Sequence, residues 1–245
     1  MKKLYEKEPV WFAVAWIMIY VLVFGNADNI SEAIGIPKLL TCVVGILLSL
    51  LLYGFIRRHG LCSHFGLCAF KGNYRAFAYF LPLILITSVN LWNGLVWQES
   101  VLTVVLHIIS MCCVGFLEEV IFRGLLFKGM CASNVKVALV VSSLTFGVGH
   151  IVNLVMGEPL FDTLLQLVYA SAIGFCYTAV FLAGGSILPC ILSHAVINST
   201  SIFARETGNQ AQLIVALIQT VLGVSYGLWL LRKHAEHLTT EENPL

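Results

Sequence analysis

Ionisable and amide side chains interrupt three otherwise apolar segments of this sequence. They are Glu118, Glu119 and Arg123 in the first segment, His150 in the second, and His194 and Asn198 in the third. A carboxylate can take a proton from water, and imidazole and carboxamide groups can donate hydrogen bonds to a developing oxyanion. Together these residue types are suited to hydrolysing a carbonyl compound. They must first be brought together around one polar cavity, because each segment would otherwise bury an unpartnered polar group.

Helix geometry separates the roles of the two adjacent glutamates. Glu119 and Arg123 are four residues apart with the acid first, which is the favourable order for an ion pair on one helix face. Glu118 points about 100° away from Glu119 and has no basic residue at the third or fourth position after it. The spacing therefore predicts that Glu119 is a structural partner of Arg123 and that Glu118 is free to act as a general base.

The two histidine segments supply the remaining groups of the predicted site. His194 and Asn198 are also four residues apart, so their side chains project from one helix face and can serve as an oxyanion-stabilising pair. His150 can hold a water molecule against Glu118. Glu118, His150 and His194 equally suit three ligands of Zn²⁺ or another divalent metal with an open fourth position. Spacing alone leaves both possibilities open.

The composition of the chain indicates that membrane-spanning helices carry these residues. Of 245 residues, 59% are hydrophobic and only 11% are charged, whereas soluble domains carry roughly a quarter charged residues. The sequence predicts an all-α polytopic membrane protein in which residues 1–245 form a single membrane domain. A formal net charge of +1 and the absence of a long basic tract give no reason to expect a nucleic-acid partner. The predicted partners are membrane lipids. About eight spanning helices are expected, near 10–25, 39–56, 76–97, 101–127, 136–156, 160–183, 186–203 and 211–231.

The distribution of basic residues predicts the orientation of these helices. Cytoplasmic loops retain Lys and Arg, so both termini are expected in the cytoplasm, and the first helix is expected to be a retained anchor. The opposite side then holds only Lys38 and Arg205. The cytoplasmic segments hold Lys2, Lys3, Lys7, Arg57, Arg58, Lys71, Arg75, Lys128, Lys136, Arg232 and Lys233.

Several other polar residues have simpler explanations. Most of the eight cysteines lie in apolar runs, where a thiol behaves as a small hydrophobic group. His107 is interpreted as an interhelical hydrogen-bonding residue outside the site. Asn90 and Asn93 either border the cavity or join neighbouring helices.

Taken together, the three polar segments resemble the CPBP family of intramembrane proteases. This family includes CAAX-processing endoproteases and Abi-type bacteriocin-processing or self-immunity proteins. The resemblance covers residues 112–201, the expected catalytic core. It rests on the motifs E-E-x-x-x-R, F-x-x-x-H and H-x-x-x-N, represented here by Glu118-Glu119…Arg123, Phe146…His150 and His194…Asn198.

The resemblance implies an endopeptidase acting on membrane-associated peptides, lipidated proteins or leader-bearing proteins. Glu118 and His150 match the water-activating positions, and His194 and Asn198 match the oxyanion-stabilising pair. Glu119, Arg123 and Phe146 are expected to support the site. Two functions from other classes compete with this one. Buried Glu and His residues also build proton-coupled transporters, and a self-immunity protein can act without catalysis.

Overall fold

The computed structural model describes residues 1–70 and 72–234. Within these ranges the chain forms helices and no strands, apart from an isolated bridge between Leu95 and Ala204. The predicted all-α fold is therefore confirmed. The helices are α1 (Lys2–Lys7), α2 (Pro9–Ala33), α3 (Leu39–Arg58), η1 (Tyr74–Phe80), α4 (Leu81–Thr87), η2 (Val89–Leu91), α5 (Val101–Glu119), η3 (Val120–Phe127), α6 (Lys128–Cys131), α7 (Val135–Gly149), α8 (Val152–Val155), α9 (Leu160–Gly184), α10 (Leu188–Thr200), η4 (Ser201–Phe203) and α11 (Asn209–Lys233).

Six helical stretches of the described chain are long and apolar enough to cross a bilayer. Two further apolar stretches, Tyr74–Thr87 and Leu188–Phe203, are shorter than the roughly 20 residues that a full crossing needs. The protein is thus a multi-pass integral membrane protein. The eight predicted apolar helical segments are all present, but the third and seventh are too short to be full-length spans. The single-domain prediction for residues 1–245 is not tested by these observations.

The prediction of one continuous helix over 76–97 is wrong. Backbone φ angles are positive at Ala78, Tyr79 and Phe80 (48°, 52° and 57°), so the chain leaves helical geometry there. Helix α4 starts afresh with Pro82 in its first turn, where the missing N–H costs nothing, and it ends at Thr87. Gly94, with φ +88°, then lies in the connection that leads to α5.

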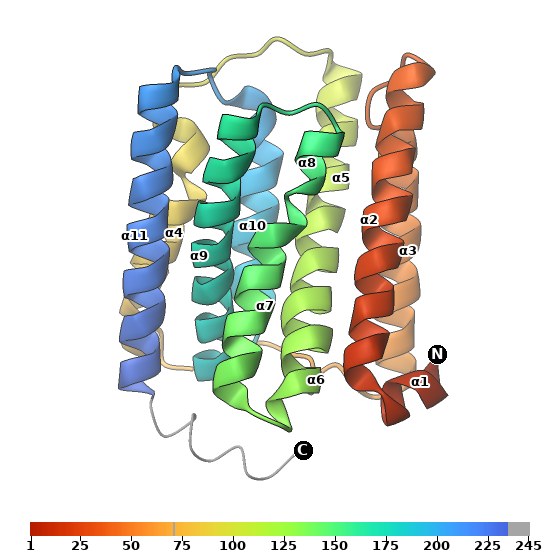
Figure 1. The fold of residues 1–245 in the computed structure, drawn as a ribbon, viewed down its shortest axis with the longest axis vertical. Coiled ribbons are helices and arrows are strands. Elements are labelled where there is room, and N and C mark those ends of the chain that lie inside the picture. The colour runs from red at the N-terminus through yellow and green to blue at the C-terminus, as the bar shows by residue number, and fades with distance from the viewer. Residues whose placement is uncertain (71, 235–245) are drawn as a thin grey trace.

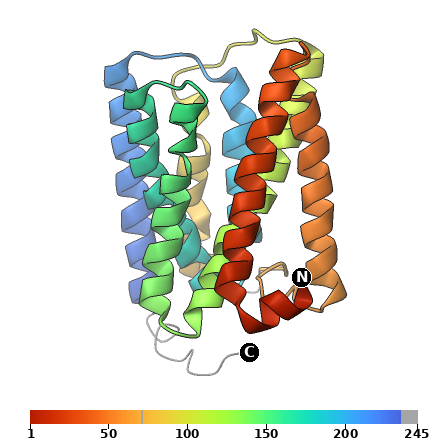
Figure 2. The same cartoon turned by 45° about the vertical axis from the view of Figure 1, so that its right-hand side comes forward.

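Figures 1 and 2 show an upright bundle with α9 near its centre. More than half of the most apolar window of α9 is buried, a larger share than in the other five spans. This helix contributes to both apolar cores: Ala170 and Phe181 belong to one with α2, α3, α5 and α7, and Tyr177 belongs to the other with α4, α10 and α11. The two halves of the bundle are therefore joined through α9.

One end of the bundle collects most of the basic residues. Helix α1, the end of α3, the short helix α6 and the end of α11 all lie at this end (Figure 1). They carry Lys2, Lys3 and Lys7, Arg57 and Arg58, Lys128, and Arg232 and Lys233. Lys71, assigned to the same set from the sequence, lies outside the described residues.

The outer surface of the bundle is apolar. Large side chains that are more than half exposed occur on several helices, including Leu50, Leu102, Leu192 and Val221. In water such an apolar surface would promote aggregation. In a bilayer it contacts the hydrocarbon chains of the lipid. The interior must therefore supply the polar contacts, because lipid cannot.

Candidate active site

Glu119 and Arg123 form a fully buried ion pair at the centre of the bundle. Nη1 of Arg123 donates to Oε1 of Glu119 at 3.0 Å, and both side chains have an exposed fraction of 0%. The pair lies where α5 passes into η3, a π-helical segment whose eight residues are all buried. Such segments occur frequently at functional sites. The pairing predicted from the four-residue spacing is present.

Small residues allow the neighbouring helices to approach this ion pair closely. A Cβ atom added to Gly115 would lie 2.7 Å from the backbone nitrogen of Ala195, so α5 and α10 pack almost backbone to backbone. A Cβ atom on Gly174 of α9 would lie 3.1 Å from Nη2 of Arg123. Close contact between membrane helices relies on such residues. Here it brings His194 of α10 within reach of both glutamates of α5.

His194 is oriented by Glu119. Its Nδ1 lies 2.9 Å from Oε1 of Glu119, the same oxygen that accepts from Arg123. A carboxylate only accepts hydrogen bonds, so the proton is on Nδ1 and the ring turns Nε2 away from Glu119. Nε2 lies 3.7 Å from Oε2 of Glu118. Glu119 therefore does more than neutralise Arg123, because it also fixes the ring that faces Glu118.

Glu118 is held by a residue from a distant part of the sequence. The hydroxyl of Tyr20 on α2 donates to Oε1 of Glu118 at 2.5 Å. Oε2 remains on the side of His194. The two carboxylate oxygens thus differ: one is bound to the phenol, and the other is available for chemistry.

Phe146 packs among the charged groups and the two imidazoles. Cζ of Arg123 lies 4.1 Å from the centroid of its ring, a cation–π contact. The rings of His150 and His194 meet it edge-on at 5.7 and 5.6 Å between centroids. The contact with Arg123 explains how the guanidinium tolerates burial although its Nε and Nη2 find no hydrogen-bond partner in the described structure.

His150 lies at a helix end rather than in the middle of a span. Helix α7 stops at Gly149, and His150 is its C-cap before the short helix α8. The predicted span over 136–156 is present as Val135–Val155, with a turn at His150 and Ile151 between α7 and α8. The imidazole of His150 lines a cavity.

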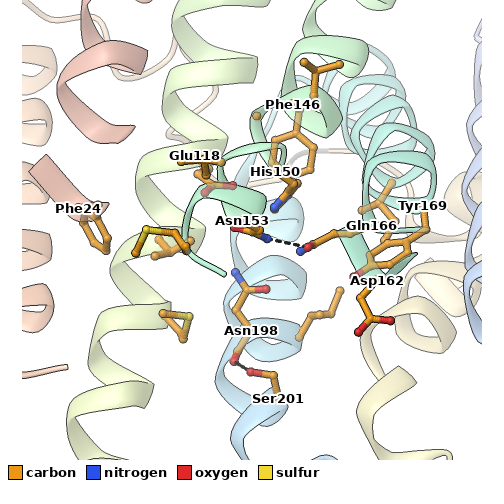
Figure 3. A pocket seen from close by; sticks show the side chains of 18 of the residues that line it. Phe24, Glu118, Phe146, His150, Asn153, Asp162, Gln166, Tyr169, Asn198 and Ser201 are labelled. Carbon is orange, nitrogen blue, oxygen red and sulfur yellow. Dashed lines mark hydrogen bonds between the residues drawn. The ribbon is translucent and has the colours of Figure 1, made fainter. Parts of the chain in front are cut away.

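The cavity has a volume of about 870 Å³ and is lined by Glu118, His150 and Asn198. Figure 3 shows these three side chains around one space, beside a hydrogen bond of 2.8 Å from Asn153 to Gln166. The cavity runs from Glu118 towards the end of the bundle opposite α1, since Lys38 and Asp162 also line it. His194 is 6% exposed and is not among the lining residues. Its Nε2 lies 3.7 Å from Oε2 of Glu118, which does line the cavity.

Two further sequence-based interpretations can be compared with the structure. His107 donates through Nε2 to the backbone carbonyl of Asn198 at 3.0 Å, which is an interhelical hydrogen bond as predicted. Asn90 both lines the cavity and donates to the carbonyl of Ile197 at 2.6 Å. Asn93 is exposed and does not line the cavity.

The proposed metal ligands do not form a metal site in this arrangement. Nε2 of His194 and Oε2 of Glu118 lie 3.7 Å apart. Across residues 1–70 and 72–234, no three His, Cys, Asp or Glu side chains converge as a metal requires. Tyr20 binds Oε1 of Glu118 and Glu119 binds Nδ1 of His194, which leaves Oε2 and Nε2 as the atoms without a hydrogen bond. As they stand, these side chains do not converge as three ligands of one ion.

Comparison with protein families identifies the central part of the chain. Residues 99–200 match the family model described as type II CAAX prenyl endopeptidase Rce1-like. We refer to this matched segment as the Rce1-like domain. It contains all three motifs and begins 13 residues before the 112–201 core predicted from the sequence, so it includes the whole of α5. Comparison with curated proteins and with solved structures finds no match to either.

The match of residues 99–200 to this family model confirms the resemblance to CPBP intramembrane proteases and indicates an intramembrane endopeptidase. Tyr20, the partner of Glu118, lies outside the matched segment. The sequence analysis did not identify it, because a tyrosine in an apolar helix is common and nothing in its spacing points to a residue 98 positions away. Only packing of α2 against the Rce1-like domain brings the two together.

The buried ion pair yields a prediction about stability. Replacing Arg123 by Met leaves the buried carboxylate of Glu119 without its guanidinium partner, and breaking a buried ion pair typically destabilises a protein by about 3–5 kcal/mol. Arg123→Met should therefore lower the thermal unfolding temperature in detergent micelles markedly. Arg58→Met, at the exposed end of α3, is the matched control and should have little effect. Equal unfolding temperatures for the two variants would contradict this account of the ion pair.

Proposed function

We propose that the protein hydrolyses peptide bonds in membrane-associated peptides, with Glu118 as the general base. The observation that carries the proposal is the position of Glu118, which lines the cavity with His150 and Asn198 while Tyr20 holds its other oxygen. The Rce1-like domain supports the reaction class. The family description supports prenylated proteins as one substrate class, and leader-bearing peptides are the other class considered.

In this mechanism a water molecule between Glu118 and His150 attacks the scissile carbonyl carbon. Oε2 of Glu118 takes one proton from the water, and the carbonyl electron pair moves to the oxygen. Asn198 donates a hydrogen bond to that oxyanion from its carboxamide. The proton held by Glu118 then passes to the leaving nitrogen as the carbon–nitrogen bond breaks.

The role of His194 depends on its protonation. Its Nδ1 proton is donated to Glu119, so Nε2 can donate to an oxyanion only when the ring carries both protons. Nε2 of this ring lies 3.7 Å from Oε2 of Glu118, the oxygen that takes the proton from water in this mechanism. We therefore assign His194 the stabilisation of negative charge that develops beside Glu118.

We further propose a water activated without a metal ion, because no three ligands converge in the described part of the chain. A matched assay decides the point. Protein purified in a buffer containing a chelator and dialysed metal-free should cleave a substrate at the same rate as untreated protein, and elemental analysis should find no stoichiometric metal. Loss of activity that added Zn²⁺ restores would establish the metal-dependent alternative.

The direct test of the base is the variant Glu118→Gln, which keeps the shape of the side chain and removes its basicity. Peptides of membrane fractions from cells carrying the wild type or this variant are compared by mass spectrometry. At least one membrane-anchored peptide should be processed only by the wild type, with a rate difference of about a hundredfold or more. Equal processing would reject catalysis by Glu118 and leave a transporter or a non-catalytic immunity protein as the explanation.

Tyr20 is proposed as a positioning residue for Glu118. Tyr20→Phe removes only the hydroxyl that donates to Oε1, so the carboxylate loses its fixed rotamer in the substrate complex. The expected result is a fall in kcat of about tenfold at unchanged KM, as for lost transition-state positioning.

The matched control is Tyr53→Phe on α3, where the hydroxyl makes no hydrogen bond to the described part of the chain. If Tyr20→Phe keeps the wild-type kcat while Glu118→Gln loses it, the phenol of Tyr20 has only a structural role.

Orientation follows from the basic end of the bundle. We propose that this end, with both termini, lies in the cytoplasm, because Lys and Arg are retained there. The cavity then extends towards the outer face of the membrane, where Lys38 and Asp162 lie. A reporter active only in the cytoplasm, fused after Leu245, should be active, and an inactive fusion would reverse the assignment.

A further inference from the structure

Helix α11 presents a polar stripe to the cavity. Gln212, Val215, Ala216 and Gln219 all line the cavity, and their spacing of three, one and three residues places them on one helix face. The opposite face of this helix carries exposed apolar residues such as Ile214 and Leu217. Helix α11 lies beyond residue 200, outside the Rce1-like domain.

The two glutamines have unmet hydrogen-bonding capacity within the described structure. Gln219 is 4% exposed, and its side chain makes no hydrogen bond to any described residue. Oε1 of Gln212 is buried and likewise has no partner in the described structure. Of the other amides that line the cavity, Asn153 donates one hydrogen bond to Oε1 of Gln166 at 2.8 Å, and the carboxamide of Asn198 makes none to the described residues.

An unsatisfied amide in a low-dielectric interior is costly, typically by about 1–3 kcal/mol. Leucine at either position would avoid that cost and would match the rest of the helix. The two amides are therefore best explained by a polar occupant of the cavity. That occupant must both donate and accept hydrogen bonds, since each carboxamide carries N–H groups and a carbonyl oxygen.

The spacing of the two amides fits an extended peptide. Seven helical residues rise about 10.5 Å at 1.5 Å per residue, and three residues of extended chain span about 10 Å at roughly 3.3 Å each. Val215 and Ala216 lie between the glutamines and offer a low apolar surface on which the peptide can rest. Glu118 lines the same cavity from α5, so a peptide lying on α11 is also exposed to the proposed base.

The stripe itself carries no charge; elsewhere the cavity is lined by the carboxylates Glu118 and Asp162 and by the ion pair of Lys38 with Asp28. Lys38 donates to both carboxylate oxygens of Asp28 at 2.8 Å. Neither Lys38 nor Asp28 is therefore available to a charged substrate. The stripe itself carries only amide and apolar side chains. Its chemistry therefore selects a peptide backbone and does not call for a charged side chain.

From these observations we infer that Gln212 and Gln219 bind the backbone of an uncharged, extended substrate segment of about three residues. The inference deepens the proposed function and rests on it for the identity of the ligand as a substrate. An acyl chain in the same cavity would leave both amides unsatisfied.

The test is a binding measurement on full-length Glu118→Gln protein in detergent, which prevents cleavage of the probe. The probe is a dansyl-labelled, capped pentapeptide of alternating leucine and alanine, and its Kd is read from fluorescence. Gln212→Leu and Gln219→Leu should each raise the Kd about tenfold, as expected for one lost hydrogen bond to a buried partner. The same peptide with N-methylated amides should bind the parent protein about as weakly as the unmethylated peptide binds the two leucine variants.

Gln210→Leu is the matched control, because Gln210 is exposed at the start of the same helix. It should leave the Kd unchanged, and thermal unfolding should show that all three variants are folded. Dansyl-undecanoic acid, an acyl probe, should be insensitive to every variant.

Unchanged peptide binding in Gln212→Leu and Gln219→Leu, or equal binding of the N-methylated peptide, would overturn the inference. Either outcome would leave the proposed function intact if Glu118→Gln still abolishes processing. Conversely, amide-dependent peptide binding together with normal processing by Glu118→Gln would refute the proposed catalysis and keep the binding site.

Discussion

The arrangement of the site depends on one carboxylate oxygen buried in a membrane protein. Oε1 of Glu119 accepts from Arg123 and also engages Nδ1 of His194. Neither charge of the ion pair can be solvated by lipid, so each must be compensated within the protein. The same compensation fixes the orientation of the imidazole, and through it the side of Glu118 that faces His194. Oε1 of Glu119 therefore both compensates the buried charge of Arg123 and orients the imidazole of His194.

The packing around Glu119 follows from this requirement. Arg123 can remain charged in the interior because Phe146 lies against its guanidinium. His194 can reach the pair because Gly115 lets α10 approach the backbone of α5. Residues that look unremarkable in the sequence are therefore as necessary to the site as its charged groups.

Local spacing was sufficient to predict part of this arrangement. The four-residue interval between Glu119 and Arg123 correctly indicated an ion pair, since helix geometry alone determines it. Apolar run length correctly indicated a polytopic helical protein, but it overestimated the third span. Pro82 and the left-handed residues before it end helical geometry in a stretch that is still apolar throughout. Hydrophobicity measures preference for lipid and is a poor guide to where a helix breaks.

Contacts between distant segments could not be predicted in the same way. Tyr20 meets Glu118, and Gln219 lines the same cavity, only because α2 and α11 pack on opposite sides of the Rce1-like domain. No periodicity links residues 98 positions apart. The role of Glu119 towards His194 was missed for a related reason. Its pairing with Arg123 accounted for the charge, but a carboxylate oxygen has two lone pairs.

The position of Tyr20 has a consequence for the timing of catalysis. Helix α2 is both a wall of the cavity and the source of the hydrogen bond to Glu118. A peptide that enters sideways from the lipid by displacing α2 would separate the phenol from the carboxylate. The base would then recover its geometry only when the wall had closed behind the substrate. Such an enzyme would be inactive while α2 is displaced. Membrane proteins that contact it only briefly would then not be cleaved.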